Sequence, residues 1–221
     1  MMRGASPVSA SADRIEALYT EFCGAPEERY SRRVGERPMV LAAVGADSLQ
    51  VATATAWLME RDVVRGIISP AEFSPSDIAR LKSAYPPRRL LTLSEALKQR
   101  ELLAKARVII TDIPAPSPFR WADIAMIGNS AHAAEDMLAA AAFGLPMLGD
   151  FRAMRHADSS DADHAANLLT LSAAIQVDSP QAFARHATWL LYDARRRHMF
   201  GAWAREYAEE LHRHRSQPAS K

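Results

Sequence analysis

The most suggestive polar residues of this chain stand where an apolar segment gives way to a helical pattern. Gly128 ends the expected strand 123–128, and Asn129 and Ser130 stand between this strand and small apolar residues at helical spacing. The first N–H groups of a helix are free to bind an anion such as phosphate, and Asn129 or Ser130 would add a hydrogen bond there. The alternative is that one of these side chains only caps the helix. The three residues therefore predict either a ligand contact or a helix cap.

Three carboxylates are further candidates for contact with a ligand. Asp112 ends the apolar segment 106–112, and Glu135 and Asp136 lie in the first turn of the next expected helix. Each has a structural alternative. Asp112 would accept N–H groups from the proline-rich turn that follows it, and acids in a first helical turn stabilise the helix dipole. Asp112 and Glu135 thus join the residues around Gly128 as candidate ligand-binding residues.

A segment rich in Asp, His and Arg, residues 149–163, is expected to be a loop. Arg152 and Arg155 would suit a phosphate group, because a guanidinium binds phosphate through two parallel hydrogen bonds. A solvated loop is the alternative. The histidines and aspartates do not have the spacing of a compact metal site. We expect no metal, no cofactor and no catalytic residue here.

Short apolar runs alternate with segments of helical spacing along most of the chain. The apolar runs are typical of strands that are buried on both faces of a parallel sheet. The expected strands are 38–44, 63–68, 90–93, 106–112, 123–128, 145–148 and 173–177. The expected helices are one between Asp13 and Gly24, then 48–60, 74–84, 94–103, 132–143, 166–171, 179–191 and 194–214. This alternation predicts an α/β fold, a single Rossmann-like domain with a mainly parallel sheet that is closed by C-terminal helices.

One continuous domain accounts for the pattern from residue 37 to residue 215. Residues 1–12 are small and polar and predict a disordered lead. Residues 13–36 predict a helix and a charged connector, and 216–221 a tail.

The composition excludes several classes of partner. Lys and Arg number 27 against 26 Asp and Glu, so no overall field attracts nucleic acid or an anionic membrane. No segment approaches the roughly 20 apolar residues that span a bilayer, and the first residues lack the apolar centre of a signal peptide. Cys23 is alone, so it forms no intrachain disulfide, and it has no His or Lys beside it to activate the thiol. We expect a cytoplasmic protein without a nucleic-acid partner or a transmembrane segment.

The closing segment is both basic and aromatic. The runs 195–198 and 212–215 are locally basic, which suits either contact with anionic lipid headgroups at the inner membrane or an exposed helix face. Trp189, Phe200 and Trp203 recur at helical spacing and predict core positions or a dimer seam.

Six stretches of the chain share their order and spacing with one known family. They are 37–43 (Arg-Pro-Met-Val-Leu-Ala-Ala), 106–112 (Ala-Arg-Val-Ile-Ile-Thr-Asp), 122–130 (Ala-Asp-Ile-Ala-Met-Ile-Gly-Asn-Ser), 140–148 (Ala-Ala-Ala-Phe-Gly-Leu-Pro-Met-Leu), 173–177 and 190–199. Together they resemble the C-terminal domain of the Kdo transferases. These GT-B glycosyltransferases of lipopolysaccharide biosynthesis move 3-deoxy-D-manno-octulosonic acid from CMP-Kdo onto a lipid A precursor. The resemblance covers residues 13–214 and implies a nucleotide-sugar-binding domain with a CMP-Kdo-like ligand.

The charged motifs of that family are replaced in this chain. Its Ser-Thr-His-Glu-Gly-Glu stretch corresponds to Val44-Gly-Ala-Asp-Ser-Leu49, and its Pro-Arg-His-Pro-Glu-Arg stretch to Pro70-Ala-Glu-Phe-Ser-Pro75, which has neither arginine. The carboxylate that holds the donor ribose falls on Ala139. The family's acceptor-binding N-terminal domain has no counterpart. The resemblance therefore implies a glycosyltransferase-like domain that is inactive alone and acts as a binding or partner module.

The alternative that the resemblance leaves open is the donor-binding subunit of a split glycosyltransferase that uses a CMP-sugar or another nucleotide sugar. Under either reading the partner would be a separate acceptor-binding protein or a second copy of the chain.

Overall fold

The computed structural model describes most of the chain, in separate ranges. They are residues 19–44, 48–64, 66–69, 89–92, 106–111, 117–128, 132–151 and 160–216, with the single positions 17, 76, 79 and 101. Two expected helices, 74–84 and 94–103, fall largely outside these residues.

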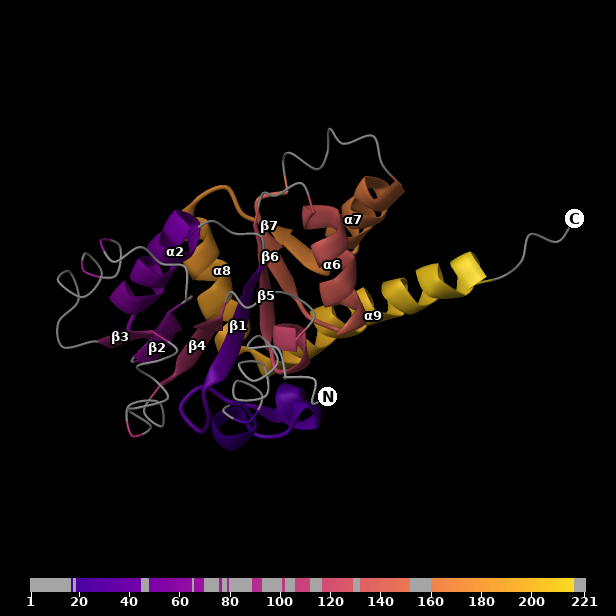
Figure 1. Ribbon diagram of the computed structural model, residues 1–221. Helices are drawn as coiled ribbons and strands as arrows, with labels where there is room; N and C mark the ends of the chain where they lie inside the picture. Colours follow the sequence, from indigo (N-terminus) through magenta and orange to yellow (C-terminus); the bar gives the residue numbers. More distant parts are fainter. Residues whose placement is uncertain are drawn as a thin grey trace, which may run out of the picture.

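A five-stranded parallel sheet forms the centre of the molecule (Figure 1). Its strands are β1 (Met39–Val44), β4 (Val108–Thr111), β5 (Ile124–Ile127), β6 (Met147–Gly149) and β7 (Ala174–Gln176). Their order is β4-β1-β5-β6-β7, and every neighbouring pair is parallel. A second parallel pair, β2 (Gly66–Ser69) and β3 (Arg89–Thr92), lies beside β4. The prediction of a single Rossmann-like α/β domain is confirmed.

Helices cover both faces of the sheet. They are α2 (Ser48–Glu60), α6 (Ala133–Ala142), α7 (Ser160–Thr170), α8 (Pro180–Tyr192) and α9 (Ala194–Ser216). α2 and α8 pack on one face, and α6 and α7 on the other (Figure 1). α9 runs from one face to the other, since its Phe200 belongs to the hydrophobic core under α2 and α8 and its Ala204 to the core under α6 and α7. No described helix combines the length and the apolar character that a membrane span requires.

The central strand β1 supplies both hydrophobic cores. All six of its residues are buried, and alternate side chains of a strand point to opposite faces. Met39 and Leu41 belong to the core under α2 and α8, whereas Val40 and Ala42 belong to the core under α6. An uninterrupted apolar strand is what burial on both faces requires.

The winding of the sheet changes direction at β1. This strand pairs with β4 on one side and with β5 on the other. In open parallel sheets, ligands bind beyond the carboxyl ends of the strands at such a point. The backbone N–H of Gly128 donates to the carbonyl of Val44 at 2.8 Å, which holds the ends of β5 and β1 together at this edge.

A buried ion pair closes the opposite, amino-terminal edge of the sheet. Arg32 Nη1 lies 3.2 Å from Asp123 Oδ2, and the two side chains are 1% and 0% exposed. The same carboxylate accepts the N–H of Val40 at 2.8 Å, and Arg32 donates to the carbonyl of Trp121 at 2.7 Å. Burial raises the pKa of Asp123, and the charge of Arg32 opposes this shift. The pair joins the connector before β1 to the starts of β1 and β5.

Two further arginines are buried at this edge. Arg29 lies on the 3-10 helix η1 (Pro26–Ser31), and Arg197 lies near the start of α9. Arg29 donates to the carbonyls of Phe119, Arg120 and Phe143, and Arg197 to those of Leu190, Leu191 and Arg32. The interpretation of 195–198 as an exposed basic face is therefore wrong for Arg197, which is 2% exposed. Helical periodicity turns this position toward the core, where carbonyl oxygens satisfy its charge.

Helix α7 begins earlier than the sequence pattern predicted. The loop was expected to reach residue 163 and the helix to span 166–171, whereas α7 occupies Ser160–Thr170. The early residues of α7 are polar and show no apolar periodicity, so the pattern contained no helical signal there. Asp163 lies near the helix start, where a carboxylate stabilises the helix dipole.

Candidate functional site

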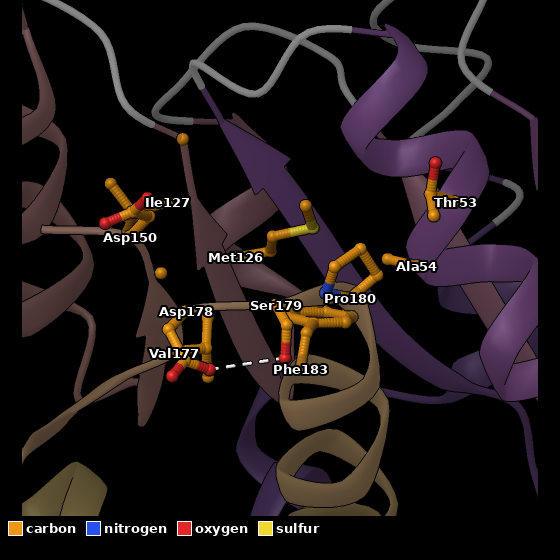
Figure 2. A pocket seen from close by; sticks show the side chains of 12 residues that line it. Thr53, Ala54, Met126, Ile127, Asp150, Val177, Asp178, Ser179, Pro180 and Phe183 are labelled. Atoms are coloured by element: carbon orange, nitrogen blue, oxygen red, sulfur yellow. Dashed lines mark hydrogen bonds between the residues drawn. The ribbon is translucent and has the colours of Figure 1, made fainter.

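A pocket of about 300 Å³ opens at the carboxyl-terminal edge of the sheet (Figure 2). It lies beyond β5, β6 and β7 and between α2 and α8. Its volume is at the lower end of the range of roughly 300–1,000 Å³ for small-molecule sites. The described residues that line it are Thr53, Ala54, Met126, Ile127, Gly128, Gly149, Asp150, Val177, Asp178, Ser179, Pro180 and Phe183.

Apolar side chains form most of the pocket wall. Met126 of β5 and Pro180 of α8 stand in its middle, with Ala54 of α2 on the far side (Figure 2). Phe183 and Ala54 continue into the buried core beneath the pocket. A flat apolar group, such as a nucleobase or one face of a sugar ring, would lose water contact against this wall.

Two carboxylates stand on the side of the pocket that β6 and β7 form (Figure 2). Asp150 directly follows β6, and Asp178 comes two residues after the end of β7. Carboxyl ends of neighbouring parallel strands meet at one edge, so both residues reach the same pocket. Asp178 is exposed and its Oδ1 accepts a hydrogen bond from Ser179 Oγ at 3.2 Å. The exposed carboxylate of Asp178 is available to accept hydrogen bonds from a ligand, and Asp150 lines the same pocket.

Helix α8 begins at the mouth of the pocket. Ser179 has an extended backbone, and its Oγ accepts the N–H of Ala182 at 3.2 Å. Pro180 follows in the first turn, where its missing N–H costs no hydrogen bond. This N-cap fixes the place at which the chain turns from the end of β7 into the helix.

Gln176 braces the loop that carries Asp150. Its Nε2 donates to Asp150 Oδ1 at 3.1 Å, and its Oε1 accepts the N–H of Phe151 at 3.1 Å. Gln176 is the last residue of β7, whereas Asp150 and Phe151 follow β6. The amide side chain therefore links the ends of two neighbouring strands and orients one pocket carboxylate.

Gly149 forms part of the pocket where two strands approach closely. A Cβ atom at this position would lie 2.3 Å from the carbonyl oxygen of Ile127 and 2.7 Å from Cε1 of Phe151. The backbone oxygen of Ile127 cannot move away from an added methyl group as the end of a flexible side chain could. Only glycine lets β6 end this close to β5.

The pocket has an acidic polar side. Among its described lining residues there is no Lys, Arg or His, and the described residues contain no group of three side chains that could hold a metal ion. Asp150 and Asp178 would repel an anion placed between them. Carboxylates accept hydrogen bonds, so they suit the hydroxyl donors of a sugar. The described part of the pocket fits a neutral molecule that has a flat apolar group and hydroxyl groups.

The structure brings one of the sequence-predicted site residues to this pocket. Gly128 lines it. Glu135 lies in the first turn of α6, exposed, with Oε2 3.4 Å from Nδ1 of His132, and it does not line the pocket. The other predicted site residues lie outside the described residues: Asp112, Asn129, Ser130, Arg152 and Arg155.

Sequence reasoning did not single out Asp150 or Asp178. Both were placed only as polar residues between elements, and Ser179 only as the start of a helix. A signal was present, because each aspartate closely follows a strand on the edge where Gly128 already suggested a site. Asp112 was selected on that same signal.

Comparison with known proteins assigns no family to the chain. No family model matches its sequence. Among curated proteins no significant match was found.

Proposed function

We propose that this chain is a nucleotide-binding module of the GT-B glycosyltransferase type, similar to the sugar-nucleotide-binding half of the Kdo transferases, and that it transfers no sugar by itself. The observation that carries the proposal is the apolar pocket with Asp150 and Asp178 along one side. Rossmann-like sheets bind nucleotides at this edge. Five of the six stretches that resemble the Kdo transferases also overlap the five strands of the central sheet.

In this proposal the nucleoside part of the ligand occupies the pocket. The base packs against Met126 and Phe183, and the ribose hydroxyls donate to Asp178 and Asp150. A hydrogen bond to a charged group contributes about 1.5–3 kcal/mol, so these two carboxylates would supply much of the binding energy and orient the sugar. Gln176 serves as a positioning residue, because it holds the Asp150 carboxylate.

The polarity of the pocket supports the lack of transfer activity. A CMP-linked acidic sugar carries negative charge on its phosphate and its carboxylate, and transfer increases the charge on the leaving phosphate. Enzymes that carry out such transfers stabilise this charge with cationic groups or aligned N–H donors. The described pocket lining offers two carboxylates and no cation.

Isothermal titration calorimetry tests the proposal with cytidine, CMP and CMP-Kdo as separate ligands. We expect cytidine to bind at least as tightly as CMP, because the described lining offers the phosphate no cation. Asp178→Asn and Asp150→Asn should each weaken cytidine binding about tenfold, the effect of losing roughly 1.4 kcal/mol. Asp163→Asn is the matched control, since Asp163 is an exposed aspartate on α7 outside the pocket.

Two results would overturn the proposal. The first is no binding of cytidine, uridine, adenosine, guanosine or their monophosphates at millimolar concentration. The second is turnover of CMP-Kdo and a lipid A precursor by the purified chain alone, which would contradict the absence of transfer activity. Turnover only after addition of a separately produced acceptor domain would identify the chain as the donor-binding half of a split enzyme.

A further inference from the structure

The large hydrophobic side chains that stay exposed in the described part of the chain gather around its last two helices. They are Leu171, Trp189, Tyr192, Met199 and Trp203. All of them belong to α8, to α9 or to the turn that follows α7. A cluster of exposed apolar side chains with a polar rim is typical of an interaction surface.

Ring contacts and a shared hollow join Trp189, Trp203 and Leu171 into one surface. The rings of Trp189 and Trp203 both pack against Phe200, with ring centroids 6.0 Å and 5.7 Å apart. Met199 precedes Trp203 by four residues on α9, so the two side chains are neighbours on the helix. Leu171 lines a hollow together with Trp203. The surface is therefore centred on Trp203, which is 37% exposed.

The hollow beside Trp203 has a volume of about 400 Å³ and both apolar and acidic walls. Its lining residues are Leu171, Trp203, Glu206, Tyr207 and Glu210. The hydroxyl of Tyr207 is held from α7 by Nδ1 of His164 at 2.7 Å and Nδ2 of Asn167 at 3.0 Å. This anchoring fixes one wall of the hollow. An occupant with an apolar part and a positive charge would match it.

The same helix presents such a group. On its outer side α9 exposes Arg195, Met199, Trp203, Glu206 and Glu210 at spacings of three and four residues, and this stripe is called the α9 stripe below. The stripe is basic at its first end, apolar in its middle and acidic at its second end. The first half of the stripe supplies a positive charge from Arg195 and an apolar side chain from Met199. These two side chains match the hollow, which lies in the second half of the stripe.

We propose that two copies of this chain pair antiparallel through the α9 stripe, about a twofold axis beside Trp203. Antiparallel pairing places Arg195 of one copy against Glu210 of the other and Met199 in the hollow beside Trp203. Twofold symmetry makes each contact twice. Arg195 and Glu210 are about 22 Å apart along the helix at 1.5 Å per residue, so the two ion pairs flank the apolar centre. The C-terminal half of α9 extends beyond the sheet (Figure 1).

The charges of the stripe favour a second copy over a lipid surface. Glu206 and Glu210 are exposed within the apolar surface, and an anionic membrane would repel both. Self-pairing instead uses these acids, because the basic end of one stripe meets the acidic end of the other. None of the stripe residues lines the pocket at the carboxyl-terminal edge, so the pairing does not depend on the proposed nucleotide binding.

Sedimentation equilibrium of the full chain tests the pairing. We expect a reversible dimer of the 24.3 kDa chain. Trp203→Ser should weaken dimerisation on the order of 100-fold, because each dimer loses two central aromatic side chains. Arg61→Glu is the control and should leave the dissociation constant unchanged, since Arg61 is an exposed arginine that follows α2.

A charge exchange tests the antiparallel arrangement. Arg195→Glu and Glu210→Arg should each weaken the dimer about tenfold, because like charges then face each other twice. The double variant should return to within about threefold of the original dissociation constant, since the exchanged pairs attract again. Circular dichroism verifies that each variant is folded.

Three results would overturn the pairing. The chain could stay a monomer at millimolar concentration. The double charge variant could fail to recover while remaining folded. Lastly, phosphatidylglycerol vesicles could bind a monomeric chain, with Trp203→Ser abolishing that binding, which would assign the surface to lipid.

Discussion

The two edges of the central sheet use charged residues in opposite ways. At the amino-terminal edge, Arg32 and Asp123 are buried together, and Arg29 is buried against backbone carbonyls. At the carboxyl-terminal edge, Asp150 and Asp178 stand beside an apolar pocket without a cation among the described lining residues. The charged residues of the first edge join segments of the fold, whereas Asp178 at the second edge is exposed beside the pocket.

This contrast shows that a charged residue must be judged by its partners. The carboxylate of Asp123 is buried, with one oxygen bonded to a guanidinium and an N–H group, so a ligand does not reach it. Asp178 has one hydroxyl partner among the described contacts and faces a cavity. Stability and binding are therefore expected to separate by edge, and substitutions at matched residues can test that separation.

The largest loss of stability is expected from Asp123→Asn. The substitution leaves the buried Arg32 without a counterion, which costs about 3–5 kcal/mol. Asp178→Asn is the matched change at the other edge, and it should cost less than about 0.5 kcal/mol because the side chain is exposed. Urea unfolding followed by circular dichroism measures both. An equal loss in the free energy of unfolding for both variants would show that the charged residues of the two edges contribute alike to stability.

A second test compares two glycines. Gly149→Ala introduces a methyl group 2.3 Å from the carbonyl oxygen of Ile127, and overpacking of this kind costs about 1–3 kcal/mol. Gly35 lies in the connector at the other edge, with φ of +99° and no atom near its Cβ position. Gly35→Ala therefore costs backbone strain alone, about 1 kcal/mol.

Ligand binding separates these two variants further. Gly149→Ala narrows the proposed nucleotide pocket and should reduce the affinity for cytidine, whereas Gly35→Ala should leave it unchanged. Thermal unfolding and calorimetry on the same samples give both quantities. A loss of cytidine affinity in Gly35→Ala would show that the connector before β1 influences the pocket, and the two edges would then not act separately.

The strands could be predicted from the sequence because burial on both faces leaves a local signature. The run 38–44 exceeds β1 by one residue at its start, and the run 123–128 exceeds β5 by one residue at each end. The agreement is close because every side chain in such a strand must be apolar. The start of α7 lacked any such signature. The polar residues that begin α7 at Ser160 predicted a continuation of the loop.

The buried arginines and the pocket acids could not be assigned because their partners are distant in sequence. Arg32 and Asp123 are separated by 91 positions, and Arg197 and Arg32 by 165. No local pattern distinguishes Arg32 from an exposed arginine. Asp150 and Asp178 became pocket residues only because β6 and β7 lie side by side, which brings their ends and Gln176 together.

The smallest expected effect concerns Cys23, a buried thiol in the core on the α6 face. Burial raises its pKa from 9.0 to about 12, although the nearby charge of Arg32 opposes the shift. Because the folded-state pKa is the higher one, the thiol contributes stability that is present below pH 9.0 and is lost as the pH rises toward about 12. With the unfolded thiol ionising first, the free energy of unfolding should fall by about 0.8 kcal/mol between roughly pH 8 and pH 9.5.

Cys23→Ala should remove this part of the pH dependence while leaving the contributions of other groups in place. The comparison needs urea unfolding of both proteins across the same pH range, and the quantity of interest is the difference between their slopes. Identical slopes would mean that Cys23 ionises as readily in the folded chain as in the unfolded one. Water would then reach the region between Arg32 and the α6 core, and the amino-terminal edge would be open as the pocket edge is.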